Sequence, residues 1–427
     1  TKTNGSPTDN AVGDSVYLWG AQLEEGSELT EYTPSVDTFD SRASSATYVD
    51  DATGLIKTTP VNLLPYSEQF DQWSVGSSTT LTPNATVAPD GTTTAYRVQF
   101  PAAASSYVQK LNVLTSGTEY TGSIWIKAVT PGTNNQVTFE YGSSAGTGAT
   151  SYFTATGEWQ RVSSTVTSVA TNFNINNKND TFATDIYLWG VQVEEGTTAT
   201  PYIKTGSTIS GAARYENGEL LLEEARTNSF TDSLFGNWST LNIQKKSTNN
   251  LAPDGTNTAV LIGDATSDGT SSLLSTAVNI VDGTQKTFTY YAKATTTGQE
   301  AYIDYYDAGL IRARGRVSLD NGAITYNQQA GDAVISATNA GNGWWRCQLT
   351  LTPAGTSSYS WRVGNYVTGD IYVWGAQLEA GSYATSYIPT AGSTVTRAAD
   401  VSTSALGVDS WYNQSEGTIF TDISPLA

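Results

Sequence analysis

The chain has 427 residues, which is room for two to three domains that each bury a core of their own. Charged residues make up only 14% and aromatic residues 11%, a composition typical of an all-β protein with many turns rather than of a coiled coil or a disordered chain. The net charge of −19 opposes contact with nucleic-acid phosphates, so we expect no nucleic-acid partner.

The residue types that are missing exclude several chemistries. There is no His, which excludes Ser-His-Asp and Cys-His catalysis and removes the commonest transition-metal ligand. The single cysteine, Cys347, excludes a disulfide framework and is predicted to be a small buried hydrophobe. No apolar run reaches the length of a transmembrane helix, and no signal peptide is recognisable. Met is absent at position 1 and elsewhere, so we expect the sequence to be a segment of a longer protein.

One short motif occurs three times and divides the chain. Its copies are Tyr17–Gly20, Tyr187–Gly190 and Tyr372–Gly375, each reading Tyr-aliphatic-Trp-Gly and each followed by Gln and Glu. Their tyrosines are 170 and 185 residues apart. This spacing indicates whole tandem domains rather than the short units of a solenoid.

The first half of the chain is predicted to hold one complete module. Residues 1–35 read as the C-terminal strand or strands of a preceding module, and residues 36–61 as a linker hairpin of two short strands around a polar turn. Residues 62–205 form the first module, in which segments such as Tyr120–Lys127 alternate cleanly between apolar and polar residues. Period-2 alternation broken by Gly, Asn and Pro is typical of an antiparallel β-sandwich.

The second half repeats this plan. A linker at 206–222 leads into a second module at 223–391, where Ala252–Thr256 repeats Ala88–Thr92 at a spacing of 164 residues. Because the motif spacing is 185, about 21 extra residues fall after this turn, and Arg316–Tyr326 is predicted to be the insertion, a hairpin turned by Asn-Gly.

Several of these segments resemble a known kind of protein. The Asn62-Leu63-Leu64 opening, the Ala-Pro-Asp-Gly-Thr turn, the Tyr-x-x-Ser-x-Trp-x-Lys strand and the closing Tyr-Leu-Trp-Gly motif resemble the carbohydrate-binding-module type of jelly roll found in bacteriophage virion proteins. Ser41–Asp50 and Leu222–Asn228 resemble the segments that join such modules in phage tail and fiber proteins. The resemblance implies an all-β fold of tandem jelly-roll β-sandwich (concanavalin-like or galactose-binding-like) domains joined by β-hairpin linkers.

The end of the chain adds a further likeness and one departure. Residues 392–427 are predicted to start a third module, because Trp411–Phe420 resembles the opening of a laminin-G or concanavalin-like sandwich. Carbohydrate-binding relatives hold a structural calcium through an acidic residue in the closing strand, where this chain has Trp189-Gly190 and Trp374-Gly375. A hard cation needs several oxygen ligands, so we expect no metal in these strands. We expect no other cofactor either.

Strand alternation also selects candidate binding residues. It turns Ile124, Phe139 and Val162 to the core of the first module and leaves polar and aromatic residues on the opposite side. Each module is thereby predicted to place an aromatic, a Lys, a carboxylate and an Arg on one sheet face: Trp125, Lys127, Glu140 and Arg161 in the first, Tyr291, Lys293, Asp304 and Arg346 in the second. Such a row could form a glycan groove, but cross-strand charge pairing on a solvated face explains it equally simply, and we favour that explanation.

Two other features have structural explanations. The adjacent carboxylates Glu194 and Glu195 cannot face one cleft as a glycosidase pair must, because neighbouring residues of a strand point to opposite faces. Trp19, Trp189 and Trp374, identical in the three motif copies, are expected to be packing anchors where each module meets its linker.

The sequence thus predicts a protein that is not an enzyme. The resemblance implies a phage virion structural protein on the virion surface, in a tail fiber or a capsid-attached decoration, with other virion proteins and host or environmental glycans as partners. Modular phage fibers are often trimers, so a homotrimer is a further expectation. Two alternatives remain: an accessory glycan-binding segment of a polysaccharide depolymerase, and a bacterial secreted adhesin.

Overall fold

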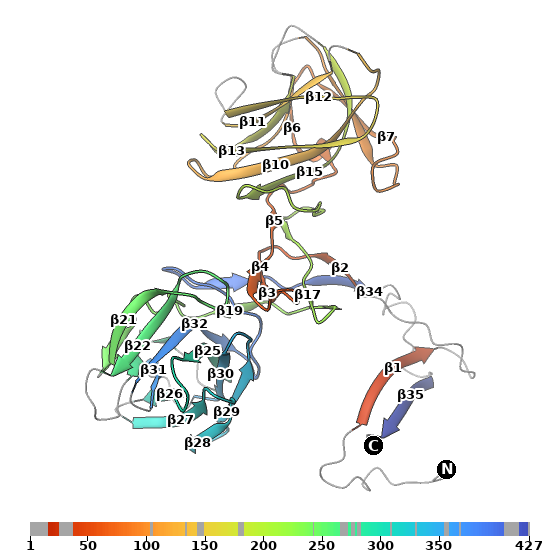
Figure 1. Ribbon diagram of the computed structural model, residues 1–427. Helices are drawn as coiled ribbons and strands as arrows, with labels where there is room; N and C mark the ends of the chain where they lie inside the picture. The colour runs from red at the N-terminus through yellow and green to blue at the C-terminus, as the bar shows by residue number, and fades with distance from the viewer. Residues whose placement is uncertain are drawn as a thin grey trace. The chain divides into compact units, whose positions relative to one another are not determined.

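The computed structural model is all-β, which confirms the predicted fold class of tandem β-sandwiches (Figure 1). It describes residues 16–24, 37–102, 106–132, 135–142, 149–177, 183–241, 243–264, 272–274, 278–279, 283–307, 310–328, 331–353, 358–366, 369–404 and 418–425. In this part of the chain the one helical element is the single 3-10 turn η1 (Phe70–Gln72). No helix in these ranges has the length and apolar character needed to cross a bilayer.

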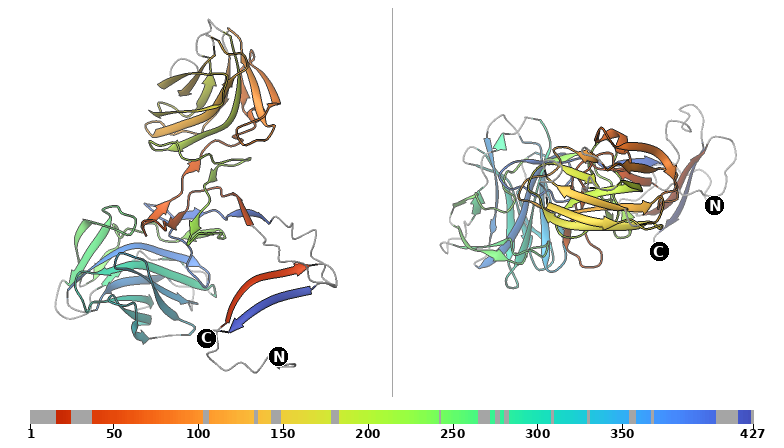
Figure 2. Two further views of the ribbon diagram at one scale, coloured as in Figure 1. Left: turned by 45° about the vertical axis from the view of Figure 1, so that its right-hand side comes forward. Right: turned by 90° about the horizontal axis from the view of Figure 1, so that it is seen from above.

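The two ends of the chain form one compact unit, and residues 41–400 form another. In the terminal unit β1 (Val16–Glu24) pairs antiparallel with β35 (Thr418–Pro425), and the two strands run side by side in Figures 1 and 2. β2 (Asp37–Ser41) likewise pairs with β34 (Val401–Ser404). The sequence analysis placed these ends in two different modules, whereas the structure pairs them. Trp411, on which the laminin-G likeness partly rests, lies outside the described residues.

Module 1, residues 62–205, is a sandwich of two five-stranded antiparallel sheets. One sheet has the order β13 (Gln160–Thr167), β10 (Glu119–Ala128), β15 (Thr184–Glu195), β8 (Ala95–Phe100), β7 (Thr80–Thr86). The other has the order β12 (Ala149–Thr154), β11 (Gln136–Tyr141), β14 (Phe173–Asn176), β9 (Tyr107–Lys110), β6 (Ser74–Val75).

The core of module 1 lies between these sheets, and the predicted alternation supplies it. Ile124 and Phe139 are fully buried and Val162 packs against the same cluster. The Tyr141 hydroxyl crosses the core to accept the Gly122 N–H at 2.9 Å and to donate to the Ser164 carbonyl at 2.9 Å. A side chain at Gly122 would collide with that hydroxyl, which explains a glycine in the middle of a strand.

Module 2, residues 223–391, repeats this sandwich with extra strands. One sheet has the order β21 (Ile243–Asn250), β22 (Ala259–Asp264), β32 (Asp370–Ala380), β25 (Lys286–Ala294), β30 (Trp344–Leu351), β29 (Val334–Asn339). The other has the order β20 (Ser239–Leu241), β23 (Ser272–Leu274), β31 (Ser358–Asn365), β26 (Glu300–Asp307), β27 (Leu310–Ser318), β28 (Ile324–Gln328), with β24 (Val278–Asn279) also on β31.

The insertion predicted from the repeat spacing is present in module 2. β27 and β28 form a hairpin that turns through Asn321 and Gly322, and Gly322 has a left-handed φ of +73°. The inserted residues extend further than predicted, because β29 follows β28 and joins the opposite sheet beside β30. Module 1 has no counterpart of β28 or β29 among its described strands, since β12 is followed directly by β13.

The repeated motif forms a central strand of each sandwich, β15 or β32, and bulges at its glycine. Gly190 and Gly375 have φ of +64° and +65°. The pairing of β10 with β15 shifts register between Ser123 and Trp125, and that of β25 with β32 shifts at the equivalent place. Gly at a positive-φ bulge position is the usual way to add one residue to a strand. The bulge explains why Gly follows Trp in both described modules.

Short strands connect the modules in a region we call the linker hub, residues 41–60, 206–226 and 392–400. Module 1 is entered by β5 (Val61–Asn62) and left by β16 (Ser210–Gly211), which pair with each other. Module 2 is entered and left in the same way by β19 (Arg226–Asn228) and β33 (Val395–Arg397). The hub also holds two hairpins, β3 (Thr47–Val49) with β4 (Ile56–Thr58) and β17 (Tyr215–Glu216) with β18 (Glu219–Leu220).

Three buried arginines fasten the hub. Arg42 and Arg214 are 0% exposed and share the two oxygens of Asp400, at 2.8 and 2.5 Å. Arg214 and Arg397 share Glu223, at 2.6 and 2.8 Å. Removing one partner of such a cluster would leave an uncompensated buried charge, which costs far more than a surface pair. The hub is therefore a specific structure and not a loose tether.

Candidate functional site

The outer face of one module 1 sheet carries three of the predicted binding residues. Trp125 and Lys127 lie two residues apart on β10, so both point away from the core. Arg161 on β13 is the direct cross-strand partner of Trp125. All three side chains are half-buried. The structure therefore brings together an indole, a guanidinium and an ammonium group as the sequence predicted.

More aromatic residues lie beside Trp125 than alternation alone could predict. Trp189 packs on Tyr202 with 4.8 Å between ring centroids and donates its indole N–H to Thr94 Oγ1 at 3.0 Å. Trp159 donates to the Val87 carbonyl at 3.0 Å. Trp125, Trp159 and Tyr202 all stay half-buried around this cluster. We call Trp125, Lys127, Trp159 and Arg161 the open aromatic face.

Two polar atoms of the open aromatic face are buried without a hydrogen-bond partner in the part of the chain that the structure describes. Trp125 Nε1 and Arg161 Nε have no hydrogen-bond partner among the described residues, although both atoms are shielded. Arg161 uses Nη2 to donate to Ser123 Oγ at 2.9 Å. Burial lowers the pKa of Arg161, with Glu194 acting in the opposite direction. An arginine stays charged at any physiological pH, so this face combines aromatic planes with a cation.

Two predicted members of the row lie elsewhere. Glu140 is on β11 and Asp304 is on β26, and both strands belong to the opposite sheet of their sandwich. The prediction of one shared face was wrong, because alternation tells which side of its own sheet a residue occupies but not to which sheet the strand belongs. Glu140 and Asp304 are each 0% exposed.

In module 2 the equivalent residues are covered by the β3–β4 hairpin, which we call the lid. Tyr291 and Arg346 are cross-strand partners, as Trp125 and Arg161 are, and Lys293 follows on β25. Tyr291 is only 5% exposed because Ile56 of the β3–β4 hairpin packs into the cluster that it forms with Trp344, Trp374 and Tyr387. We call these four aromatic residues the covered aromatic face: Tyr291, Trp344, Trp374 and Tyr387.

The hairpin is fixed to module 2 by backbone contacts at the repeated Pro-Asp-Gly turn. The Ile56 N–H donates to the Pro253 carbonyl at 3.0 Å, and Leu55 lies against Gly255. Thr47 Oγ1 donates to the Tyr387 carbonyl at 2.5 Å. The turn has a direct counterpart in module 1, at Pro89 and Gly91. No hydrogen bond to the Pro89 carbonyl is seen in the described part of the chain.

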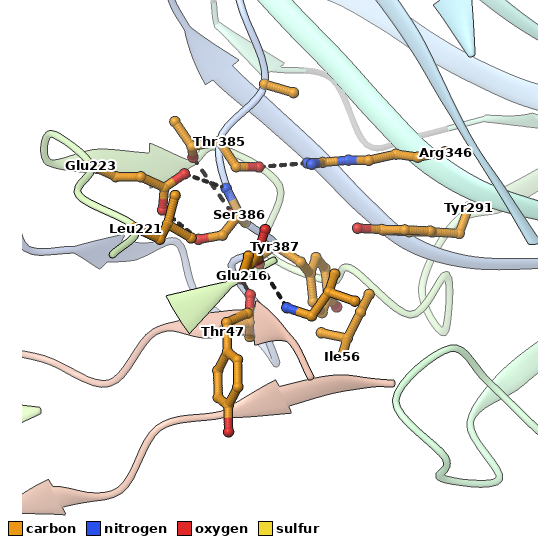
Figure 3. A pocket seen from close by; sticks show the side chains of 13 residues that line it. Thr47, Ile56, Glu216, Leu221, Glu223, Tyr291, Arg346, Thr385, Ser386 and Tyr387 are labelled. Carbon is orange, nitrogen blue, oxygen red and sulfur yellow. Dashed lines mark hydrogen bonds between the residues drawn. The ribbon is translucent and has the colours of Figure 1, made fainter. Parts of the chain in front are cut away.

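A cavity of about 270 Å³ lies between the lid and module 2 (Figure 3). Figure 3 shows Tyr291 and Arg346 pointing the same way, toward the segment that carries Thr385 and Ser386. Arg346 donates to the Thr385 carbonyl at 2.7 Å and to Thr289 Oγ1 at 3.2 Å. The bond to the Thr385 carbonyl connects Arg346 to the exit segment of the module. Burial raises the pKa of Tyr291.

The repeated tryptophans are buried in both modules. Trp189 and Trp374 are 5% and 2% exposed and stack on the tyrosines of the exit segments, Tyr202 and Tyr387. Burial raises the pKa of both tyrosines, with Glu68 adding to the effect at Tyr202. Trp19 lies on β1, and its side chain is outside what the structure describes.

The twin carboxylates do not form a catalytic pair. Glu194 is 2% exposed, and its oxygens accept the Thr200 N–H at 3.0 Å and the Thr200 hydroxyl. Glu195, next on the strand, is exposed. Glu379 in module 2 makes the same two bonds to Thr385. Within the described ranges no group of three or more His, Cys, Asp or Glu could hold a metal ion.

The fold and the site define a protein of tandem β-sandwich modules, and the comparisons with known proteins add the following. The chain is similar to the tandem CBM22-1–CBM22-2 domain of Paenibacillus barcinonensis Xyn10C, with 12% identity and a TM-score of 0.27 over 76% of this chain and 98% of that one. It is also similar to the CBM22-1–GH10 modules of Clostridium thermocellum endo-1,4-beta-D-xylanase 10B complexed with xylohexaose, with 20% identity and a TM-score of 0.22. That second match covers 39% of this chain and 30% of the other. No family model and no curated protein matches the sequence.

Proposed function

We propose that this chain is a non-enzymatic structural segment of a bacteriophage virion, in a tail fiber or a capsid-attached fiber, and that module 1 binds glycans on its open aromatic face. The observation that carries the glycan proposal is the half-exposed group of Trp125, Trp159 and Arg161, in contrast to the lidded equivalent in module 2. Sugar rings stack on aromatic planes and take hydrogen bonds from planar donors, and this face offers both. The resemblance of the linker segments to those of phage fibers supports the virion context.

In this proposal the two modules have different tasks. Module 1 presents its open aromatic face to host-surface or environmental glycans. Module 2 is held to the linker hub by its lid and by the arginine cluster, so it acts as a rigid spacer. Other virion proteins would be the partners of the fiber, and a homotrimer would give three copies of a weak site and therefore avidity.

A glycan array probed with the full chain tests the binding part. We expect selective binding by the wild type and a loss of about tenfold or more in affinity for Trp125→Ala, because a stacking plane of this kind is worth about 1–3 kcal/mol. Val169→Ala, a change at an exposed position of the same module outside the open aromatic face, is the control and should bind normally. An array on which the wild type binds no glycan would remove the attachment role.

The virion and non-enzyme parts need their own measurements. Mass spectrometry of purified particles should find peptides of this chain in the virion. Incubation of the full chain with polysaccharides that it binds should release no reducing sugar. Peptides found only in bacterial culture supernatant would favour a secreted adhesin, and sugar release would show an enzyme.

A further inference from the structure

A second surface of module 2, on the sheet opposite the lid, gathers arginines and tyrosines. Strand pairing places Tyr302 between Gly364 and Arg316, and Asp304 between Arg362 and Arg314. Next along, Arg316 faces Tyr326 of the inserted strand β28. We call the following residues the arginine–tyrosine face: Tyr302, Asp304, Tyr306, Arg314, Arg316, Tyr326, Arg362 and Tyr366.

The side chains of this face hold one another in fixed positions. Asp304 is fully buried and accepts hydrogen bonds from Arg314 at 2.5 Å and from Arg362 at 2.7 Å. The guanidinium groups then lie over tyrosine rings: Arg314 over Tyr302 at 4.6 Å, Arg362 over Tyr306 at 4.1 Å, and Arg316 over Tyr326 at 4.4 Å and Tyr366 at 3.1 Å. Stacking of this kind keeps a guanidinium plane pre-organised for a ligand.

Positive charge exceeds negative charge on this face. Its arginines are Arg314, Arg316 and Arg362, whereas Asp304 and Glu300 are the carboxylates that alternation puts there. Arg316 makes no ion pair with a carboxylate among the described residues, and its Nε has no hydrogen-bond partner there. In a chain of net charge −19, such a cationic surface is an unusual local concentration.

Module 1 shows that the sandwich does not require these arginines. Its equivalent strands pair Glu140 with Thr150 and with Asn174, and Thr138 with Tyr152. The same sheet positions are therefore filled by neutral side chains around one carboxylate. The charge, and the flanking Tyr326 on the inserted hairpin, are particular to module 2.

From these contacts we infer that the arginine–tyrosine face binds an acidic polysaccharide that carries carboxylate groups, such as a uronic-acid polymer. Arginine recognises a carboxylate through two parallel hydrogen bonds, and Arg316 has the donors for it. Tyr326 and Tyr366, each 38% exposed, flank Arg316 and supply planes against which sugar rings can lie. The inference shares with the proposed function the view that the chain binds glycans, but it uses other residues in the other module.

Calorimetric titration of the full chain with oligogalacturonate, and with the same oligomer after reduction of its carboxyl groups, tests the inference. We expect binding of the acidic oligomer only, with affinity falling as salt rises. Arg316→Ala should weaken it about tenfold and Arg316→Lys less, because Lys keeps the charge but not the planar fork. Tyr326→Ala, at an exposed position that cannot affect folding much, should weaken it several-fold.

Other ligands and one variant in module 1 separate this site from its alternatives. Trp125→Ala should leave oligogalacturonate binding unchanged. The proposals for the two sites can therefore be tested independently. Equal binding of the reduced oligomer, or equal binding of inorganic phosphate and dextran sulfate, would overturn the inference by showing either no need for the carboxylate or simple attraction of anions. Binding that is unchanged in both Arg316→Ala and Tyr326→Ala would also overturn it.

Discussion

Modules 1 and 2 carry the same cluster of four aromatic residues on the same sheet, yet only one of the two clusters is covered. Trp125, Trp159 and Tyr202 are half-buried in module 1, whereas Tyr291, Trp344 and Tyr387 are at most 5% exposed in module 2. The difference comes from the β3–β4 hairpin, which places Ile56 in one cluster and has no counterpart on the other among the described residues. A repeated sequence thus supplies a packing surface in one place and a candidate binding surface in another.

The linker hub maintains this difference, so breaking it should have the largest effect. Arg214→Ala removes the arginine shared by Glu223 and Asp400. We expect a loss of about 3–5 kcal/mol because the fully buried Asp400 and the largely buried Glu223 each lose a partner. Hydrogen exchange followed by mass spectrometry should show faster exchange of the hub and the lid. Arg97→Ala, which breaks a surface pair with Asp185, is the control and should cost at most about 1 kcal/mol. Equal effects of the two variants would contradict the account.

The lid itself can be loosened without touching the charges. Ile56→Ala shortens the side chain that packs against the covered aromatic face. We expect the unfolding free energy to fall by about 2–3 kcal/mol. This lies in the lower part of the range for large-to-small changes, because the hairpin can move into the space left by the side chain. Exchange should rise in the hairpin, and Trp344 should become accessible to acrylamide. Val87→Ala, an exposed position of module 1, should change little. A Trp344 that stays shielded in Ile56→Ala would show that the hairpin is not the lid.

Acid should open the covered face before it affects the open one. Burial opposes ionisation of Glu223, but Arg397, Ser386 and Arg214 outweigh it and hold the pKa of this carboxyl below its ordinary 4.5. Its stabilisation of the hub is therefore complete above pH 4.5 and is lost as the pH falls through the lower folded value. Hub and lid exchange should accelerate below pH 4.5, and Glu223→Gln should flatten this dependence. Parallel acceleration across both modules would contradict a hub-specific effect.

The two cores also differ at the cross-strand pair that contains Cys347, and a change there should have the smallest effect. Cys347 faces Tyr290 in module 2, where Val162 faces Ile124 in module 1. Cys347 is fully buried, and burial raises the pKa of its thiol to about 12. Cys347→Ala should lower the unfolding free energy by only about 1 kcal/mol, since a single side-chain atom, Sγ, is removed from the core. The wild-type thiol should not react with a maleimide at neutral pH, and rapid labelling of the folded chain would contradict the structure.

The sequence predicted the sandwiches well because they depend on local signals. Alternation in Tyr120–Lys127 placed Trp125 and Lys127 on the outer face, and the repeat spacing located the hairpin through Gly322. Cys347 is buried as its strand pattern indicated. These features depend on the period of apolar residues and on the residue types that form turns, and both can be read from a single sequence.

The features that the sequence did not predict depend on contacts between distant residues. Arg42, Arg214 and Arg397 come from three segments far apart in the chain, and nothing near Arg42 indicates that it binds Asp400, 358 residues away. The assignment of Glu140 and Asp304 to the other sheet depends on strand order, which alternation does not encode. The lid was also missed, because Ile56 precedes module 1 in sequence but packs on module 2. One sequence signal could have indicated the hub: Arg42, Arg214 and Arg397 each lie in a linker segment next to small residues.

Hydroxyl-radical footprinting of the full chain tests the central claim most directly, since it reports the accessibility of each aromatic side chain in solution. The account predicts clear oxidation of Trp125 and Trp159 together with protection of Tyr291 and Trp344, and protection of Trp125 when a bound glycan is added. Equal oxidation of the two clusters, or protection of both in the free chain, would contradict the division into an open and a covered face.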